Sequence, residues 1–229
     1  FTDIHKYLRF LEEMIILTLD EYGLKAKSAH IHLHTLNTRM PEVGEAARSL
    51  GLECVGIAFI PEEKRKTLDG YKRMADEFNV LGDLAKKEGL KFIYHNHGYG
   101  LKEQDDQVPM KLILDNTDPE LVFFEMDIFW TTAGGANPIE YLKSYPNRYL
   151  CIHLKDMSKL VYFSKDGSNP QQWIELLPYM TNVGNGILDI KQIVYEAKKN
   201  GVKHFFVEQD MVENPKIALQ ASLDFLKNI

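Results

Sequence analysis

The chain alternates between segments with helical spacing of apolar residues and short segments that are apolar almost throughout. The first pattern predicts amphipathic helices, and the second predicts strands buried on both faces of a sheet. We expect helices over residues 3–22, 41–50, 68–88, 109–114, 138–145, 188–200 and 215–227. We expect strands over residues 24–33, 53–60, 91–97, 121–127, 149–155 and 203–208.

The regular alternation of helix and strand favours an α/β fold with a parallel sheet covered by helices. A seventh strand is expected within residues 179–183, before the turn at 184–186. A (β/α)8 TIM barrel has eight strands, so its first strand would precede the opening helix. An open doubly wound sheet is the alternative, but only a closed barrel would bring together coordinating residues from strands scattered along the chain. The length of 229 residues, with 45% hydrophobic residues, suits a single domain over residues 1–229.

Coordinating side chains stand at the ends of three expected strands: Asp127, His153 and Glu208. Parallel strands present their carboxyl ends on one side of the sheet, where ligand sites of α/β folds lie. Two carboxylates and an imidazole that face one centre would form a set of ligands for a divalent metal ion. Alternatively, Asp127 is a helix N-cap or a salt-bridge partner, His153 is a core histidine, and Glu208 pairs with Lys155 or Lys203.

Further histidines extend this group. His95 and His97 share one face of their strand, because side chains alternate along a strand. His30, His32 and His34 also share a face, but they span roughly 13 Å, so at most two could reach one ion. We expect His30 or His32 to contact substrate instead.

The overall charge limits the partners of the protein. A net charge of −6 disfavours nucleic acids and anionic membranes, which require a basic face, and fits a small polar substrate. No apolar run approaches the roughly 20 residues of a membrane span, and we expect Cys54 and Cys151 to be free thiols. We expect a cytoplasmic protein, with the periplasm as the alternative because the sequence opens at Phe1. A homo-oligomer remains open.

Five motifs, taken in order, resemble those of the sugar phosphate isomerase/epimerase family, the xylose isomerase-like TIM barrels. The similarity runs from about Leu24 to the end of the chain. The motifs are Tyr94-His95-Asn96-His97, Asp127-Ile128-Phe129-Trp130, His153-Leu154-Lys155-Asp156, Val183-Gly184-Asn185-Gly186 and Val207-Glu208-Gln209-Asp210. The resemblance implies a (β/α)8 barrel that holds one divalent cation (Mn²⁺, Mg²⁺, Co²⁺ or Zn²⁺) between two Glu, one Asp and one His. Asp127, His153 and Glu208 would be three of those ligands.

The fourth ligand departs from the family pattern. Many relatives place a glutamate three residues after the second histidine of the Tyr-His-Asn-His motif, where this chain has Gly100. Glu103 could fold back, His95 or His97 could replace the missing ligand, or water could complete the site. We favour a histidine of this strand, because strand ends fix geometry better than loops do.

The resemblance implies a metal-dependent isomerase or epimerase that acts on a carbohydrate, a sugar or keto-sugar, through an enediolate. Glu208 would then be the base, His95 or His97 would return the proton, and Lys155 and His30 would hold substrate oxygens. Trp130 would wall a sugar pocket, although packing is the more common role for such an aromatic residue.

Two other functions remain open: a metal-dependent lyase or hydratase on a keto-sugar or keto-glycoside, and a non-catalytic sugar-binding protein. The related endonuclease IV branch is disfavoured, because it needs a basic track for DNA. Residues 158–179 are longer than a normal connection and follow the strand of His153. We expect them to form a lid or pocket wall, or else an oligomer contact.

Overall fold

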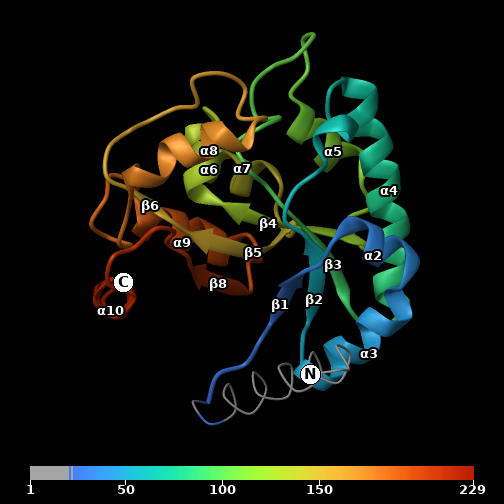
Figure 1. Ribbon diagram of the computed structural model, residues 1–229, viewed down its shortest axis with the longest axis horizontal. Helices are drawn as coiled ribbons and strands as arrows, with labels where there is room; N and C mark the ends of the chain where they lie inside the picture. The colour runs from blue at the N-terminus through green and yellow to red at the C-terminus, as the bar shows by residue number, and fades with distance from the viewer. Residues whose placement is uncertain (1–20, 22) are drawn as a thin grey trace, which may run out of the picture.

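The fold is seen in a computed structural model, which describes residue 21 and residues 23–229 (Figure 1). The helix expected over 3–22 lies outside the described residues, apart from residue 21. Among the residues described, no helix is both long and apolar enough to cross a membrane.

Six parallel strands form the central sheet, and each pairs with its neighbour in the order β1-β2-β3-β4-β5-β8. This number is six of the eight that a closed (β/α)8 barrel contains. All six expected strands are present with shortened ends. They are β1 (Ser28–His30), β2 (Cys54–Ile57), β3 (Lys91–His95), β4 (Val122–Asp127), β5 (Tyr149–Leu154) and β8 (His204–Val207).

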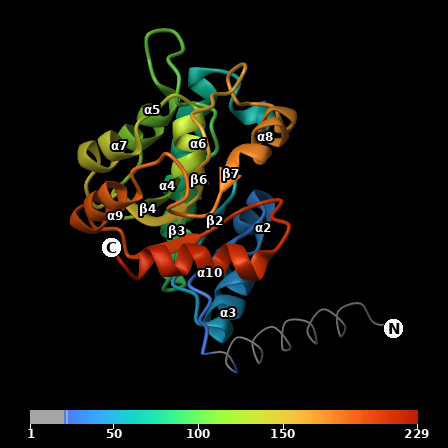
Figure 2. The ribbon, with the colours of Figure 1, turned by 90° about the vertical axis from the view of Figure 1, so that its left-hand side faces the viewer.

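The described helices surround this sheet. Figure 1 shows α3, α4 and α5 on the right and β8 on the left, and Figure 2 shows α10 lying across that left-hand side. Six of the expected helices are present: α3 (Met40–Leu50), α4 (Leu68–Lys87), α5 (Pro109–Asn116), α7 (Pro138–Ser144), α9 (Ile190–Lys199) and α10 (Pro215–Leu226). Local signals set their ends. The Thr67 hydroxyl accepts a hydrogen bond from the Gly70 amide at the start of α4, and Gly51 ends α3 with a φ of 69°.

Three short helices were not expected from the sequence: α2 (Leu33–Thr38), α6 (Ile128–Ala133) and α8 (Pro170–Leu176). Two of them, α2 and α6, begin within a few residues of the end of a strand. The remaining helical segments of the described chain are two single turns of 3-10 helix, η1 (Glu62–Lys64) and η2 (Leu177–Tyr179).

The expected seventh strand exists but does not join the parallel sheet. It is β7 (Met180–Thr181), which pairs antiparallel with β6 (Asp156–Met157), while β5 pairs directly with β8. The buried Asp156 carboxylate accepts hydrogen bonds from the amides of Gly184, Gly186 and Leu188. These contacts hold the segment after β7 against β6.

Strand β4 shows how the sheet separates core from site. Val122, Phe124 and Met126 join the apolar core beneath the helices, where Phe78 of α4 lies 5.1 Å from the Tyr94 ring of β3. Alternation along the strand turns Glu125 and Asp127 to the opposite face. The inner face is therefore the one that receives the charged side chains.

Candidate metal and substrate site

Three buried side chains from neighbouring strands converge on the inner face of the sheet. His95 ends β3, Asp127 ends β4 and His153 lies in β5, and one ligand atom from each falls within 4.8 Å of the others. His95 Nε2 is 3.6 Å from Asp127 Oδ2, and His153 Nδ1 is 3.8 Å from the same oxygen. Ligands about 2.1 Å from a tetrahedral ion lie roughly 3.4 Å apart. The two observed separations are close to that spacing.

The three converging atoms make no properly directed hydrogen bond within the described chain. His95 Nε2, Asp127 Oδ2 and His153 Nδ1 are all buried without one, although Lys155 Nζ and Glu208 Oε2 form ion pairs with the second and third of these atoms. Buried polar atoms are almost always satisfied, because desolvation without a partner costs free energy. Two imidazole nitrogens and a carboxylate oxygen form a donor set suited to a divalent cation such as Zn²⁺ or Mn²⁺. The residues present therefore fit such an ion.

Glu208 reaches the same cluster from the end of β8. Its Oε2 is 2.5 Å from His153 Nδ1, a direct contact that leaves no space for an ion between the two atoms. Because the Glu208 side chain is 37% exposed, it has room to rotate away from His153. It could then serve as a fourth ligand.

Asp127 divides its two carboxylate oxygens between fold and site. Its Oδ1 accepts a hydrogen bond from the Trp130 amide at 2.9 Å and so caps α6. Its Oδ2 faces His95 and His153. The helix-cap role considered from the sequence is therefore real, and it leaves the second oxygen available as a ligand.

Lys155 neutralises the acidic side of the cluster. Its Nζ lies 3.1 Å from Asp127 Oδ2, 2.9 Å from Glu208 Oε1 and 3.3 Å from Asp210 Oδ2, and the side chain is only 3% exposed. Burial disfavours the ammonium ion, but the nearby carboxylates outweigh it and raise the pKa of Lys155. Of the two ion pairs considered for Glu208 from the sequence, the one with Lys155 is therefore the one present.

The charges of the cluster depend on one another. Burial favours the neutral form of each carboxylic acid, but Lys155 and the histidines hold the pKa of Asp127 well below its usual range and lower that of Glu208 to about 2. Burial also opposes the charged form of His153, yet Asp127, Glu125 and Glu208 together raise its pKa to about 11. The carboxylates are therefore ionised at neutral pH, as cation binding requires, whereas His153 is protonated there and would have to release a proton to bind a cation through Nδ1.

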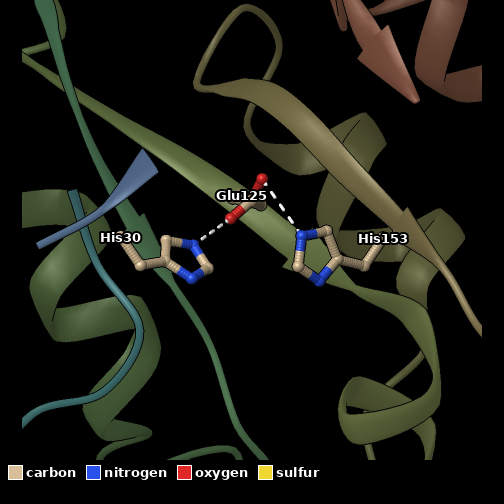
Figure 3. Close-up of side chains that lie close together, drawn as sticks. All are labelled: His30, Glu125 and His153. Atoms are coloured by element: carbon tan, nitrogen blue, oxygen red, sulfur yellow. Dashed lines mark hydrogen bonds and ion pairs between the residues drawn. The ribbon is translucent and has the colours of Figure 1, made fainter. Parts of the chain in front are cut away.

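His30, from the end of β1, approaches the cluster through a buried carboxylate. Glu125 lies between His30 and His153 and contacts a ring nitrogen of each (Figure 3). His30 is not part of the ligand set formed by His95, Asp127 and His153, although its ring centroid lies 5.2 Å from that of His95. His32 caps α2 by accepting a hydrogen bond from the His34 amide, and both of these histidines are exposed away from the cluster.

A cavity of about 700 Å³ opens over the cluster. Its wall includes His30, His97, Lys155 and Glu208. Aromatic rings complete the wall: the Trp173 ring stacks on His97 at 4.2 Å between centroids, and Trp130 is also part of the lining. The volume suits a sugar-sized molecule.

Residues 158–179 contribute to the wall of this cavity. Pro170, Trp173, Ile174 and Leu177 from α8 and η2 line it. The pocket-wall interpretation of this segment thus agrees with the geometry. Trp173 and Glu125 were not among the site residues predicted from the sequence. The available signal for Glu125 was its position two residues before Asp127, on the same face of the strand.

Gly100 and Glu103 lie elsewhere. Both line a separate cavity beside Tyr71 and Arg65. A Cβ at Gly100 would point at the Tyr71 hydroxyl, 3.0 Å away, and the φ of +75° disfavours any side chain there. Neither residue supplies a ligand in this arrangement, so His95 is the strand residue closest to that role.

Known proteins share the sequence pattern of this chain. A family model described as xylose isomerase-like TIM barrel matches residues 19–229. Inosose dehydratase 2 of Bacillus cereus (strain ZK / E33L) is 32% identical over 203 residues, which cover 82% of this chain and 64% of the relative. The chain spans less than two thirds of the length of the first curated relatives it matches.

Solved structures share the fold. A sugar phosphate isomerase/epimerase from Parabacteroides distasonis superposes with a TM-score of 0.76 at 22% identity, over 94% of this chain and 75% of that one. The IOLI protein with a bound zinc atom gives a TM-score of 0.69 at 18% identity, over 97% of this chain and 84% of that one.

Proposed function

Because the chain belongs to the xylose isomerase-like TIM barrel family, we propose that it is a divalent-cation-dependent enzyme acting on a keto-sugar or keto-polyol. The reaction would begin with removal of the proton next to the keto group. The observation that carries this proposal is the convergence of His95 Nε2, Asp127 Oδ2 and His153 Nδ1, all buried and near enough to one another to hold one ion.

His95, Asp127, His153 and Glu208 would hold the cation. When bound, the cation would supply Lewis-acid stabilisation of the negative charge that develops on a substrate oxygen. Zinc in the IOLI protein, a distant relative of the same fold, is consistent with a metal at this place. Mn²⁺, Mg²⁺ and Co²⁺ remain open.

The side chains around the cavity would bind and orient the substrate. Lys155 carries a buried positive charge at the cavity wall and would hold a substrate hydroxyl or carbonyl oxygen. His30 and His97 present imidazoles to the same space and are the proposed proton carriers. Trp130 and Trp173 would pack against the apolar face of the ring and exclude water.

Glu208 fits a ligand better than a base. Both of its oxygens are engaged, by His153 and by Lys155, and these contacts lower its pKa to about 2. A base of such low pKa removes protons poorly near neutral pH. We therefore place proton abstraction on His30, since burial also lowers the pKa of His97 well below its usual range, and retain Glu208 as a ligand.

Loss of water is the outcome that we favour after proton abstraction. The proton leaves one carbon, a hydroxide leaves the next carbon as water, and a conjugated enone remains, with no change in overall oxidation state. The name of the Bacillus cereus relative, inosose dehydratase 2, supports this choice at 32% identity. Isomerisation or epimerisation is the second candidate, in line with the name of the Parabacteroides protein, and would return the proton to carbon instead.

Proton NMR in D2O on Mn²⁺-loaded protein tests the proposal with inosose and a panel of keto-sugars. We expect exchange of the proton next to the ketone, followed by signals of an enone. Return of a deuterated isomer or epimer would favour the second candidate.

Glu208→Gln should reduce exchange at least ~100-fold, because removal of a charged ligand weakens cation binding, while the matched buried variant Glu196→Gln should leave the exchange rate unchanged. Absence of exchange with every substrate, despite bound metal, would contradict the enzyme and favour a sugar-binding protein.

A further inference from the structure

Glu125 is a fully buried carboxylate with no role in the proposed reaction. It lies in β4 two residues before Asp127, so both side chains project from the same face of the strand. Burial of a lone carboxylate costs several kcal/mol unless charged or hydrogen-bonding groups compensate it. Its partners therefore define its function.

Those partners are two histidines from different strands. Glu125 Oε2 is 2.5 Å from His30 Nε2, and Glu125 Oε1 is 3.2 Å from His153 Nε2 (Figure 3). The carboxylate thus bridges β1 and β5 across the strand on which it lies. His30 lines the substrate cavity, and His153 belongs to the cation cluster.

The contact with His153 has a directional consequence. With Nε2 aimed at Glu125, the ring presents its other nitrogen, Nδ1, to Asp127 and Glu208. A carboxylate that accepts the N–H of one ring nitrogen fixes the tautomer in which the other nitrogen binds metal, and it also fixes the orientation of the ring.

We propose that Glu125 is a positioning residue that holds His153 Nδ1 toward the cation. Through its second oxygen it also fixes the position of the His30 ring in the cavity wall. This inference rests on the cation of the proposed function. It assigns Glu125 no contact with the substrate or with the ion.

A different arrangement would place an ion between His30, Glu125 and His153, whose ligand atoms also lie within 4.8 Å of one another. The distance of 2.5 Å between His30 Nε2 and Glu125 Oε2 opposes it, because two ligands of one ion stand roughly 3.4 Å apart. The 2.5 Å contact is that of a direct hydrogen bond. The arrangement around Asp127, with separations of 3.6 and 3.8 Å, suits an ion better.

Calorimetric titration of the full chain with Zn²⁺ alone tests the proposal without any substrate. We expect one ion per chain, with affinity lowered about 10- to 100-fold in Glu125→Gln and unchanged stoichiometry. Glu196→Gln, which changes a buried carboxylate on α9, is the matched control and should bind as the wild type does.

The outcomes separate the two proposals. If Glu125→Gln binds Zn²⁺ with the wild-type affinity, the positioning role is overturned and the proposed function stands. The same holds if the wild type binds two ions per chain and Glu125→Gln binds one. Failure of the wild type to bind any ion overturns both proposals.

A spectroscopic measurement on the wild type covers the case in which Glu125→Gln does not fold. Long-range ¹H–¹⁵N correlation of the Zn²⁺-loaded protein, labelled with ¹⁵N in histidine, reports which ring nitrogen carries the proton. We expect His153 protonated at Nε2 and metal-bound at Nδ1. The opposite tautomer would overturn the proposal.

Discussion

At the scale of single residues, the site depends on side chains whose two polar atoms serve two partners. Asp127 caps α6 with one oxygen and faces the cation cluster with the other. Glu125 contacts His30 with one oxygen and His153 with the other, and His153 contacts Glu125 through Nε2 and Glu208 through Nδ1. Such sharing fixes each side chain in one orientation, which is what a preorganised metal site requires.

Some of these residues could be predicted from the sequence, and others could not. Asp127, His153 and Glu208 stood out because a charged or coordinating group at the end of an apolar strand is costly without a function. The pairing of His30 with Glu125 joins residues separated by 95 positions, and no local pattern reports such a contact. Asp127 does cap a helix and Glu208 does form an ion pair with Lys155, and both residues also belong to the cluster.

Lys155 yields a prediction at this scale. Replacement by methionine removes the positive charge beside Asp127, Glu208 and Asp210 while keeping an apolar side chain. Because loss of one partner leaves a buried charge uncompensated, the cation-free protein should lose about 3 kcal/mol of unfolding free energy. Saturating Mn²⁺ should restore part of that loss, since the ion would compensate the same carboxylates.

Urea unfolding with and without Mn²⁺ measures this effect, with Lys86→Met, on the last turn of α4, as the control. Equal destabilisation in both conditions would show that the carboxylates next to Lys155 do not bind the ion.

At the scale of elements, strands and long helices followed from the apolar pattern, whereas short helices did not. The helix α6 starts directly after β4, and only the capping bond from Asp127 to Trp130 marks the change. The helix α8 is a single short segment inside a polar passage, where the apolar residues are too few to show a helical period. Its tertiary contacts, rather than its own sequence pattern, give it a place over the cavity.

The sequence motif Val183-Gly184-Asn185-Gly186 has a structural explanation at the same scale. The amides of Gly184 and Gly186 donate to the Asp156 carboxylate at 2.9 and 3.0 Å. Gly184 has a φ of +91°, and a Cβ at that position would collide with the Phe225 ring. This motif therefore shapes the chain after β7 and contributes no ligand to the cluster.

The wall formed by α8 yields a prediction. Trp173 stacks on His97 and donates a hydrogen bond from Nε1 to the Gly167 carbonyl oxygen at 2.7 Å. Trp173→Ala should raise KM about 5- to 30-fold, with a smaller change in kcat, because an aromatic contact of about 1–2 kcal/mol to the substrate ring is lost. Trp173→Phe keeps the ring without the hydrogen bond and should retain most of the affinity. Steady-state kinetics on the keto substrate measures both variants, and an unchanged KM in Trp173→Ala would remove this residue from the binding site.

At the scale of the whole molecule, the curved parallel sheet brings together groups that are distant in the sequence. The ends of β1, β3, β4, β5 and β8 carry the charged and coordinating side chains to one cavity, although they span residues 30 to 208. The carboxyl ends of these parallel strands lie on one side of the sheet, which explains this convergence, and the match to the xylose isomerase-like TIM barrel family agrees with it. The direct pairing of β5 with β8 could not be predicted, because it joins strands about 50 residues apart that no local pattern relates.

Anomalous diffraction from crystals soaked in Mn²⁺ tests the cation site most directly. We expect a single peak in contact with His95 Nε2, Asp127 Oδ2 and His153 Nδ1, with the Glu208 carboxylate turned toward it. A peak between His30 and Glu125 instead, or no peak at a Mn²⁺ concentration that saturates the protein in solution, would contradict the proposed site.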